Sequence, residues 1–253
     1  MVVGLAFVAT AVSALFAQAM LVRWTQSHRP QNGAWAAALA MFALASAALA
    51  TGASTGWDRG TFRVFYLFGA ILDVPWLALG TIYLLASPKV AQRVRLFLLV
   101  FSGFAAGVLL SAPMEPVSGT AIPVGKDVFG ALPRILAAVG SGVAAFVIIA
   151  GAIYSAVRYA RDRGPGHARL AGANALIAVG TVILSSGGLV QGAIGHDEAF
   201  SLSLALGISV IYSGFVLAGS ASRVGSTSRP QQPDSQPDPQ QPDPQQEVKV
   251  HSA

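Results

Sequence analysis

The chain has 253 residues, of which 54% are hydrophobic and only 11% are charged. Soluble domains carry about 25% charged residues, so this composition excludes an ordinary soluble protein and indicates lipid as the solvent. The net charge of +5 does not indicate nucleic-acid binding, because the basic residues lie in short gaps between apolar runs, where they act as topology signals. Cysteine is absent, which excludes disulfides, thiolate metal sites and a cysteine nucleophile.

Several apolar runs are long enough to cross a bilayer, which takes roughly 20 residues of helix. They are continuous and lack the apolar–polar alternation of barrel strands, and lipid accepts only helices or closed barrels. We therefore predict an all-α membrane protein, a bundle of seven transmembrane helices. In chain order the predicted spans are Val2–Val22, Gly33–Thr51, Val64–Ala86, Leu96–Ala112, Ile135–Val157, Leu170–Ile194 and Ala199–Gly219.

The first span has two interpretations. It contains Ala17-Gln18-Ala19, which resembles a signal-peptidase site, so it is either a retained helix or a cleaved signal. A signal peptide normally begins with basic residues, and none precedes this run, which favours a retained helix.

The basic residues predict the orientation in the cell membrane. Eleven Lys and Arg residues follow the first, third, fifth and seventh spans, whereas four lie in the loops on the other side. Cytoplasmic loops carry the excess of Lys and Arg. The N-terminus is therefore predicted outside and the C-terminus in the cytoplasm.

Asp73 is the only ionisable residue well inside any predicted span. It lies about ten residues from either end of the third span, or about 15 Å deep at 1.5 Å per residue. An ionised carboxylate at that depth costs several kcal/mol unless it faces protein or water. We therefore predict that Asp73 points into the bundle and is uncharged at rest.

Asp73 belongs to a stripe of polar, aromatic and small residues on one face of the third span. Their steps of three and four are the spacing of a single helical face. The opposite face is apolar, and we predict that it contacts lipid. The inward stripe consists of Tyr66, Gly69, Asp73, Trp76, Gly80 and Tyr83. The predicted lipid-facing set consists of Phe68, Ile71, Leu79 and Ile82.

Pro75 lies two residues after Asp73 and has no amide hydrogen, so it removes the bond to the carbonyl of Ile71 and predicts a kink. Freed carbonyls beside a buried acid offer a place for a cation, a proton or a hydroxyl. Two interpretations remain open. Asp73 is a functional centre, as intramembrane acids are by default, or it is a neutral acid that bonds a Ser or Tyr of a neighbouring helix and holds the bundle together.

The sixth and seventh spans carry small and hydroxyl residues at helical spacing. Such residues most often form packing seams, as we also expect for Gly103 with Gly107 and Gly188 with Gly192. Beside Asp73 they would instead line a polar cavity. The predicted binding residues are Asp73, Tyr66, Trp76 and Tyr83 on the third span, Asn174, Thr181 and Ser185 on the sixth, and Tyr212 on the seventh.

The loop Pro113–Pro133 is long, whereas the other predicted connections between spans are short. It is either a solvated connector or a lid over an outward cavity, since long loops are often functional.

Residues 1–222 form the predicted transmembrane domain, and residues 223–253 form a Pro-, Gln- and Asp-rich cytoplasmic tail. The tail segment Pro230–Glu247 repeats Gln-Pro-Asp without aromatic or branched apolar residues, so it cannot bury a core and is predicted to be disordered. Spans one to three and five to seven run in the same direction and share a basic first gap and an acidic entry to the third helix. This pattern suggests a 3+1+3 parallel pseudo-repeat.

Enzymatic chemistry finds no support in the sequence. The seventh span has no lysine for a retinal Schiff base, and the four histidines lie in loops or the tail without His-x-x-x-His spacing. No Walker loop is present. We therefore predict no enzyme, no catalytic residue, no cofactor and no metal.

The segment Phe65–Gly80, FYLFGAILDVPWLALG, and the alanine-rich helices resemble seven-helix polytopic membrane proteins of high-GC bacteria. The resemblance covers the helices and leaves out the tail. It implies no activity, because no activity is assigned to that group, and it gives no residue a role.

Two functions compete. The first is binding or passage of a small solute or proton centred on Asp73, which requires a continuous polar path from Asp73 to both faces. The second is a signalling or scaffold subunit without transport, which recruits a protein partner through its helices or tail. It predicts a fully capped Asp73 and no cavity.

Overall fold

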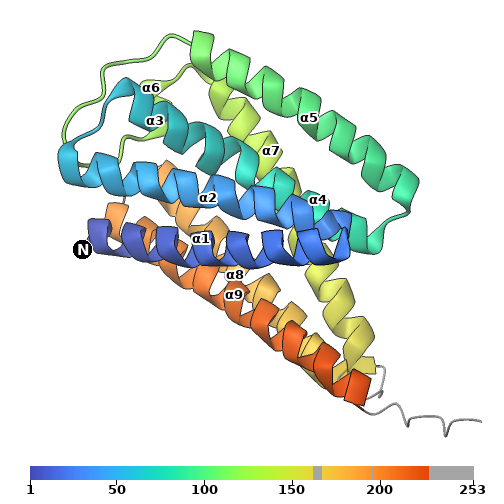
Figure 1. Cartoon of the computed structure of the whole chain (residues 1–253). Coiled ribbons are helices and arrows are strands. Elements are labelled where there is room, and N and C mark those ends of the chain that lie inside the picture. The colour runs from blue at the N-terminus through green and yellow to red at the C-terminus, as the bar shows by residue number, and fades with distance from the viewer. Residues whose placement is uncertain (162–166, 195, 228–253) are drawn as a thin grey trace, which may run out of the picture.

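The computed structural model describes residues 1–161, 167–194 and 196–227 (Figure 1). These residues form helices joined by short connections, and seven helices are long and apolar enough to cross a membrane, which confirms the predicted all-α fold. The spans are α1 (Val2–Ser27), α2 (Pro30–Thr55), a three-part span of α3 (Arg59–Phe65), η1 (Tyr66–Leu72) and α4 (Asp73–Leu85), then α5 (Pro88–Ser111), α7 (Ala131–Arg161), α8 (His167–Ile194) and α9 (Asp197–Thr227).

The third span lies at the centre of the packing. It contacts α2 on one side and α7 on another, and α5 packs on α4, η1 and α7. The pair α1 and α2 and the pair α8 and α9 each run side by side, and α9 also packs on α1 (Figure 1). A polar residue midway along the third span is therefore surrounded by protein.

The last helix is longer than predicted. It continues to Thr227, eight residues beyond the predicted end of the seventh span at Gly219. Nothing in that stretch stops a helix, because the first proline after it is Pro230. The remaining predicted tail, residues 228–253, lies outside the described residues.

The third span starts at a polar cap on Asp58. Its carboxylate accepts hydrogen bonds from the amides of Gly60 (2.7 Å) and Thr61 (3.0 Å) and from the Thr61 hydroxyl (2.6 Å). These bonds, with the Thr61 hydroxyl as the largest effect, hold the pKa of the Asp58 carboxyl below its ordinary value. The charged side chain thus satisfies amides that the first helical turn leaves without partners.

Close helix packing occurs at other glycines than those predicted. Among the described residues, no side chain or neighbouring helix lies within 4 Å of the Cβ position at Gly103, Gly107 or Gly188, so the predicted seam of Gly103 with Gly107 is wrong. The tight seam joins α8 to α9, where a Cβ on Gly180 would meet the Gly207 carbonyl oxygen at 2.8 Å. Spacing alone does not say which face of an alanine-rich helix meets a neighbour.

The segment after α5 lies over one end of the bundle and packs part of its side chains there, whereas ten of its residues 113–130 are exposed to solvent. It contains the short helix α6 (Gly125–Val128), and Ile122, Val128 and Phe129 are 4%, 6% and 3% exposed. The Ile122 amide donates to the Asp197 carboxylate of α9 at 2.8 Å. We call residues 113–130 the cap; its apolar side chains pack on the third span.

Candidate functional site

A helical irregularity positions Asp73 in the middle of the third span. Residues Tyr66–Leu72 form a π-helix, and the Asp73 amide bonds the carbonyl of Phe68, five residues back. Pro75 begins the next turn without an amide hydrogen, so the predicted disturbance of the helix is present as a π segment. Such segments are frequent at functional sites.

The irregularity leaves backbone carbonyls to be satisfied by another helix. In π register the Ala70 carbonyl would accept from residue 75, which is proline. The Ser141 hydroxyl of α7 instead donates to the Ala70 oxygen at 2.6 Å. At the next position of α7, a Cβ on Gly140 would lie 3.5 Å from the Ile71 oxygen. The Gly140–Ser141 segment is therefore fitted against the carbonyls that proline frees.

The Asp73 side chain is 7% exposed and lies on the same break. Its Oδ1 accepts a hydrogen bond from the Val74 amide at 2.6 Å. In the described part of the chain, no charged side chain forms an ion pair with this carboxyl. The acid is thus buried as predicted, and Oδ1 has a backbone amide as its partner, whereas the structural interpretation placed a Ser or Tyr of a neighbouring helix there.

The predicted lipid-facing side of the third span is wrong for two of its members. Ile71 is fully buried and Leu79 is 1% exposed, and both belong to hydrophobic core clusters. The reason is the central position of this span, which has α2, α5 and α7 around it and leaves little of either face to lipid.

The aromatic residues of the predicted stripe separate toward the two ends of the bundle. Tyr66 lies under the cap, with its ring 5.0 Å from that of Phe129 and 5.8 Å from that of Phe62. Trp76 and Tyr83 lie beyond Asp73 toward the other end, on the wall of a groove.

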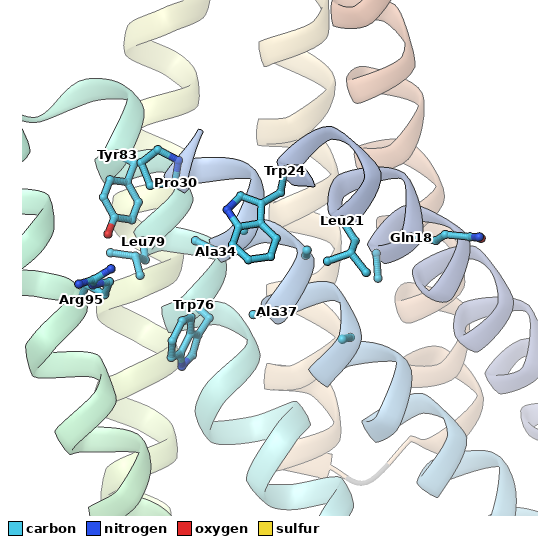
Figure 2. Close-up of a pocket in the computed structure, with 14 residues that line it drawn as sticks. Gln18, Leu21, Trp24, Pro30, Ala34, Ala37, Trp76, Leu79, Tyr83 and Arg95 are labelled. Carbon is cyan, nitrogen blue, oxygen red and sulfur yellow. The ribbon is translucent and has the colours of Figure 1, made fainter. Parts of the chain in front are cut away.

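This groove has a volume of about 530 Å³ and lies between α1, α2, α4 and α5 (Figure 2). Trp24 of α1 and Trp76 of α4 are directed into it, and Tyr83 lies near Arg95 of α5 at one side. The Trp76 indole donates from Nε1 to the Ser102 hydroxyl at 3.1 Å, which fixes this wall. Asp73 does not line the groove; it lies three residues before Trp76 in the third span.

The predicted residues of the last two spans have separate environments. Thr181 is 3% exposed and donates to the Ile177 carbonyl of its own helix at 2.8 Å, while Asn174 and Ser185 are half-buried on α8. The Tyr212 ring packs edge-on against Phe16 of α1 at 5.2 Å. The contacts of Thr181 and Tyr212 thus support packing roles, and neither side chain reaches the groove.

Two contributors to the site were missed by sequence reasoning. Ser141 carries the hydroxyl at the helix break, and Trp35 of α2 donates from Nε1 to the Leu77 carbonyl at 3.2 Å. The Gly140-Ser141-Gly142 triplet was a usable signal, because small residues let membrane helices approach closely. Nothing in the alanine-rich sequence around Trp35 predicts its contact with the third span.

We expect Ser141→Ala to lower the stability of the protein by about 1 kcal/mol, because the part-buried Ala70 carbonyl loses its donor inside a membrane span. Ser111→Ala is the matched control, since that hydroxyl is exposed and bonds carbonyls of its own helix. Thermal unfolding in detergent measures both. Equal midpoints for the two variants would show that the Ser141 bond contributes nothing.

No family model, curated protein or solved structure matches the chain. Within the described residues, no group of three or more His, Asp or Glu side chains is arranged to hold a metal ion. The features of the molecule that bear on function are Asp73, the helix break and the groove.

Proposed function

We propose that this integral membrane protein binds a proton or a small solute at Asp73, and that this binding is coupled to movement of the third span. The observation that carries the proposal is the position of Asp73: a 7% exposed carboxyl at the junction of a π-helix and a proline turn. Intramembrane acids that lack a basic partner usually mark ion or proton sites.

The geometry suits a group that gains and loses a proton. A protonated carboxyl keeps a carbonyl oxygen that accepts from the Val74 amide, and its hydroxyl becomes a donor. An ionised carboxylate is acceptor-only and strengthens the bond to the amide. The protonated and ionised states thus form different hydrogen bonds with a helix whose regular backbone bonding is already interrupted at Pro75.

Access to Asp73 is from the groove and not from the cap. Apolar and aromatic side chains of the cap and third span pack together at one end. At the other end the groove reaches Trp76, one helical turn from Asp73. The continuous polar path that transport requires is not formed by the groove in this conformation. Passage would need the Trp76 side chain to leave Ser102, so proton binding is better supported than an open channel.

Infrared difference spectroscopy on the protein in lipid tests proton binding directly. We expect a protonated-carboxyl band at neutral pH that disappears in Asp73→Asn. Asp58→Asn is the matched control, because Asp58 lies on the same span, is exposed, and is replaced by another good capping residue. A spectrum unchanged by Asp73→Asn would remove the proposal.

A scaffold or signalling subunit is the second candidate, and the bond between Asp73 and Val74 favours it. In that case the acid only caps a broken helix, and a protein partner is recruited through the helices or the tail. No catalytic residue or cofactor belongs to either proposal. The two candidates differ in whether a neutral isostere of Asp73 keeps full function.

The proposed orientation in the cell membrane places the cap outside and the end of α9 in the cytoplasm, as the Lys and Arg distribution predicts. Alkaline phosphatase fused within residues 113–130 should therefore be active, and the enzyme fused after Thr227 should be inactive. A green fluorescent protein fused after Thr227 should fluoresce. The reverse pattern would contradict the orientation.

A further inference from the structure

The groove between α1, α2, α4 and α5 has walls of two kinds. Its body is apolar, with alanines of α2, Trp24, Trp76 and Leu79, whereas Arg95 of α5 lies at its side together with Tyr83 (Figure 2). A ligand that fits this surface has a long apolar part and a group that accepts hydrogen bonds from a guanidinium.

Positive charge continues beyond the groove along α5. Arg95 also lines an adjoining hollow of about 370 Å³ with Lys89 and Arg93, and all three side chains are exposed. The segments that meet here, residues 18–37 and 76–99, contain no Asp or Glu. The charge of this end is therefore not neutralised by the walls, and an anion is the complementary partner.

The groove is open rather than enclosed, and its position within the spans gives it access to acyl chains. Its length follows α4 from Trp76 to Tyr83, which is about 10 Å at 1.5 Å per residue. α5 packs on α4, η1 and α7, and Leu79 of α4 lies between Ala34 of α2 and Leu98 of α5, so the groove is the part of this interface that side chains leave open. A membrane-embedded apolar groove with a basic end fits an anionic lipid better than it fits a water-soluble solute.

We propose that this groove is a binding site for an anionic phospholipid, with an acyl chain against Trp24, Ala37 and Trp76 and the phosphate at Arg95. The basic end is the one that the Lys and Arg distribution predicts to be cytoplasmic, where anionic lipids give the membrane its negative surface potential. Lipid binding does not require proton binding at Asp73, because Asp73 does not line the groove.

Native mass spectrometry of the whole chain, released from vesicles of equal parts phosphatidylcholine and phosphatidylglycerol, tests the site. We expect phosphatidylglycerol to be retained in preference to phosphatidylcholine. Arg95→Gln should reduce this preference about fivefold, the effect of one basic residue near a charged headgroup. Arg158→Gln is the matched control, since Arg158 is exposed on α7 and does not line the groove.

A second pair of variants separates the groove from surface charge. Ala37→Phe fills the groove and should abolish retention of both lipids, whereas Ala14→Phe on the exposed side of α1 should not. Equal retention of the two lipids by the unmodified protein would overturn the proposal, and so would a preference that Arg95→Gln does not reduce. Loss of preference in Arg158→Gln as well would assign the effect to general surface charge and would equally overturn it.

Discussion

Gly80→Val is expected to be among the most destabilising single substitutions in the chain. A Cβ on Gly80 would overlap the Trp35 indole, which covers this position from α2. The ring cannot move without losing the hydrogen bond from its Nε1 to the Leu77 carbonyl, now 3.2 Å long. Overpacking of this kind costs about 3 kcal/mol, so the midpoint of thermal unfolding in detergent should fall clearly.

Gly107→Val gives the control for this experiment. Gly107 lies four residues before the end of α5, much as Gly80 lies five residues before the end of α4, but no described side chain or neighbouring helix lies within 4 Å of its Cβ position. The same three-atom side chain should therefore be tolerated there. If both variants unfold at the same temperature, the loss comes from the β-branched residue in the helix, and the contact between α2 and α4 is not the cause.

The class of fold and the approximate spans follow from composition and run length, because lipid leaves the chain few alternatives. The lateral arrangement does not follow from them. Leu79 and Ile71 have the character of lipid-facing residues, yet both are buried because the third span is central. In a membrane, apolar side chains suit lipid and protein equally, so hydropathy cannot distinguish a central helix from a peripheral one.

Asp73 could be singled out from sequence because a buried charge in a membrane is costly and rare. Its surroundings could not. The π-helix depends on how Pro75, Ser141 and Gly140 fit together across two helices, and α7 is more than sixty residues away in sequence. Likewise, Thr181 and Tyr212 satisfied the spacing of a cavity wall but pack within and between other helices.

Two side chains form hydrogen bonds at the helix break, one from α7 and one from the third span itself. Ser141 holds the Ala70 carbonyl from α7, and Asp73 holds the Val74 amide from within the same helix. One interaction is fixed, whereas the other involves a group that can change its charge. A change of protonation at Asp73 would therefore act on the span between the groove and the cap, which is the coupling that the proposed function requires.

Asp73→Asn and Asp73→Leu should separate function from structure. The Asn amide oxygen can still accept from Val74, so this variant should unfold at the temperature of the unmodified protein. Asp73→Leu leaves that amide without the side-chain acceptor in a buried position, which should cost about 1–3 kcal/mol. Thermal unfolding of the two purified variants in detergent measures the difference.

Proton flux into vesicles, followed with an internal pH-sensitive dye, supplies the functional half of the test. If Asp73 binds a proton in the course of transport, Asp73→Asn should be stable and should carry no flux, while Asp58→Asn should keep it. An Asp73→Asn protein as unstable as Asp73→Leu would instead show that the acid serves the fold. A stable Asp73→Asn protein with the same flux as the unmodified chain would show that no proton is exchanged at this residue, because an amide cannot take the place of a carboxyl that ionises.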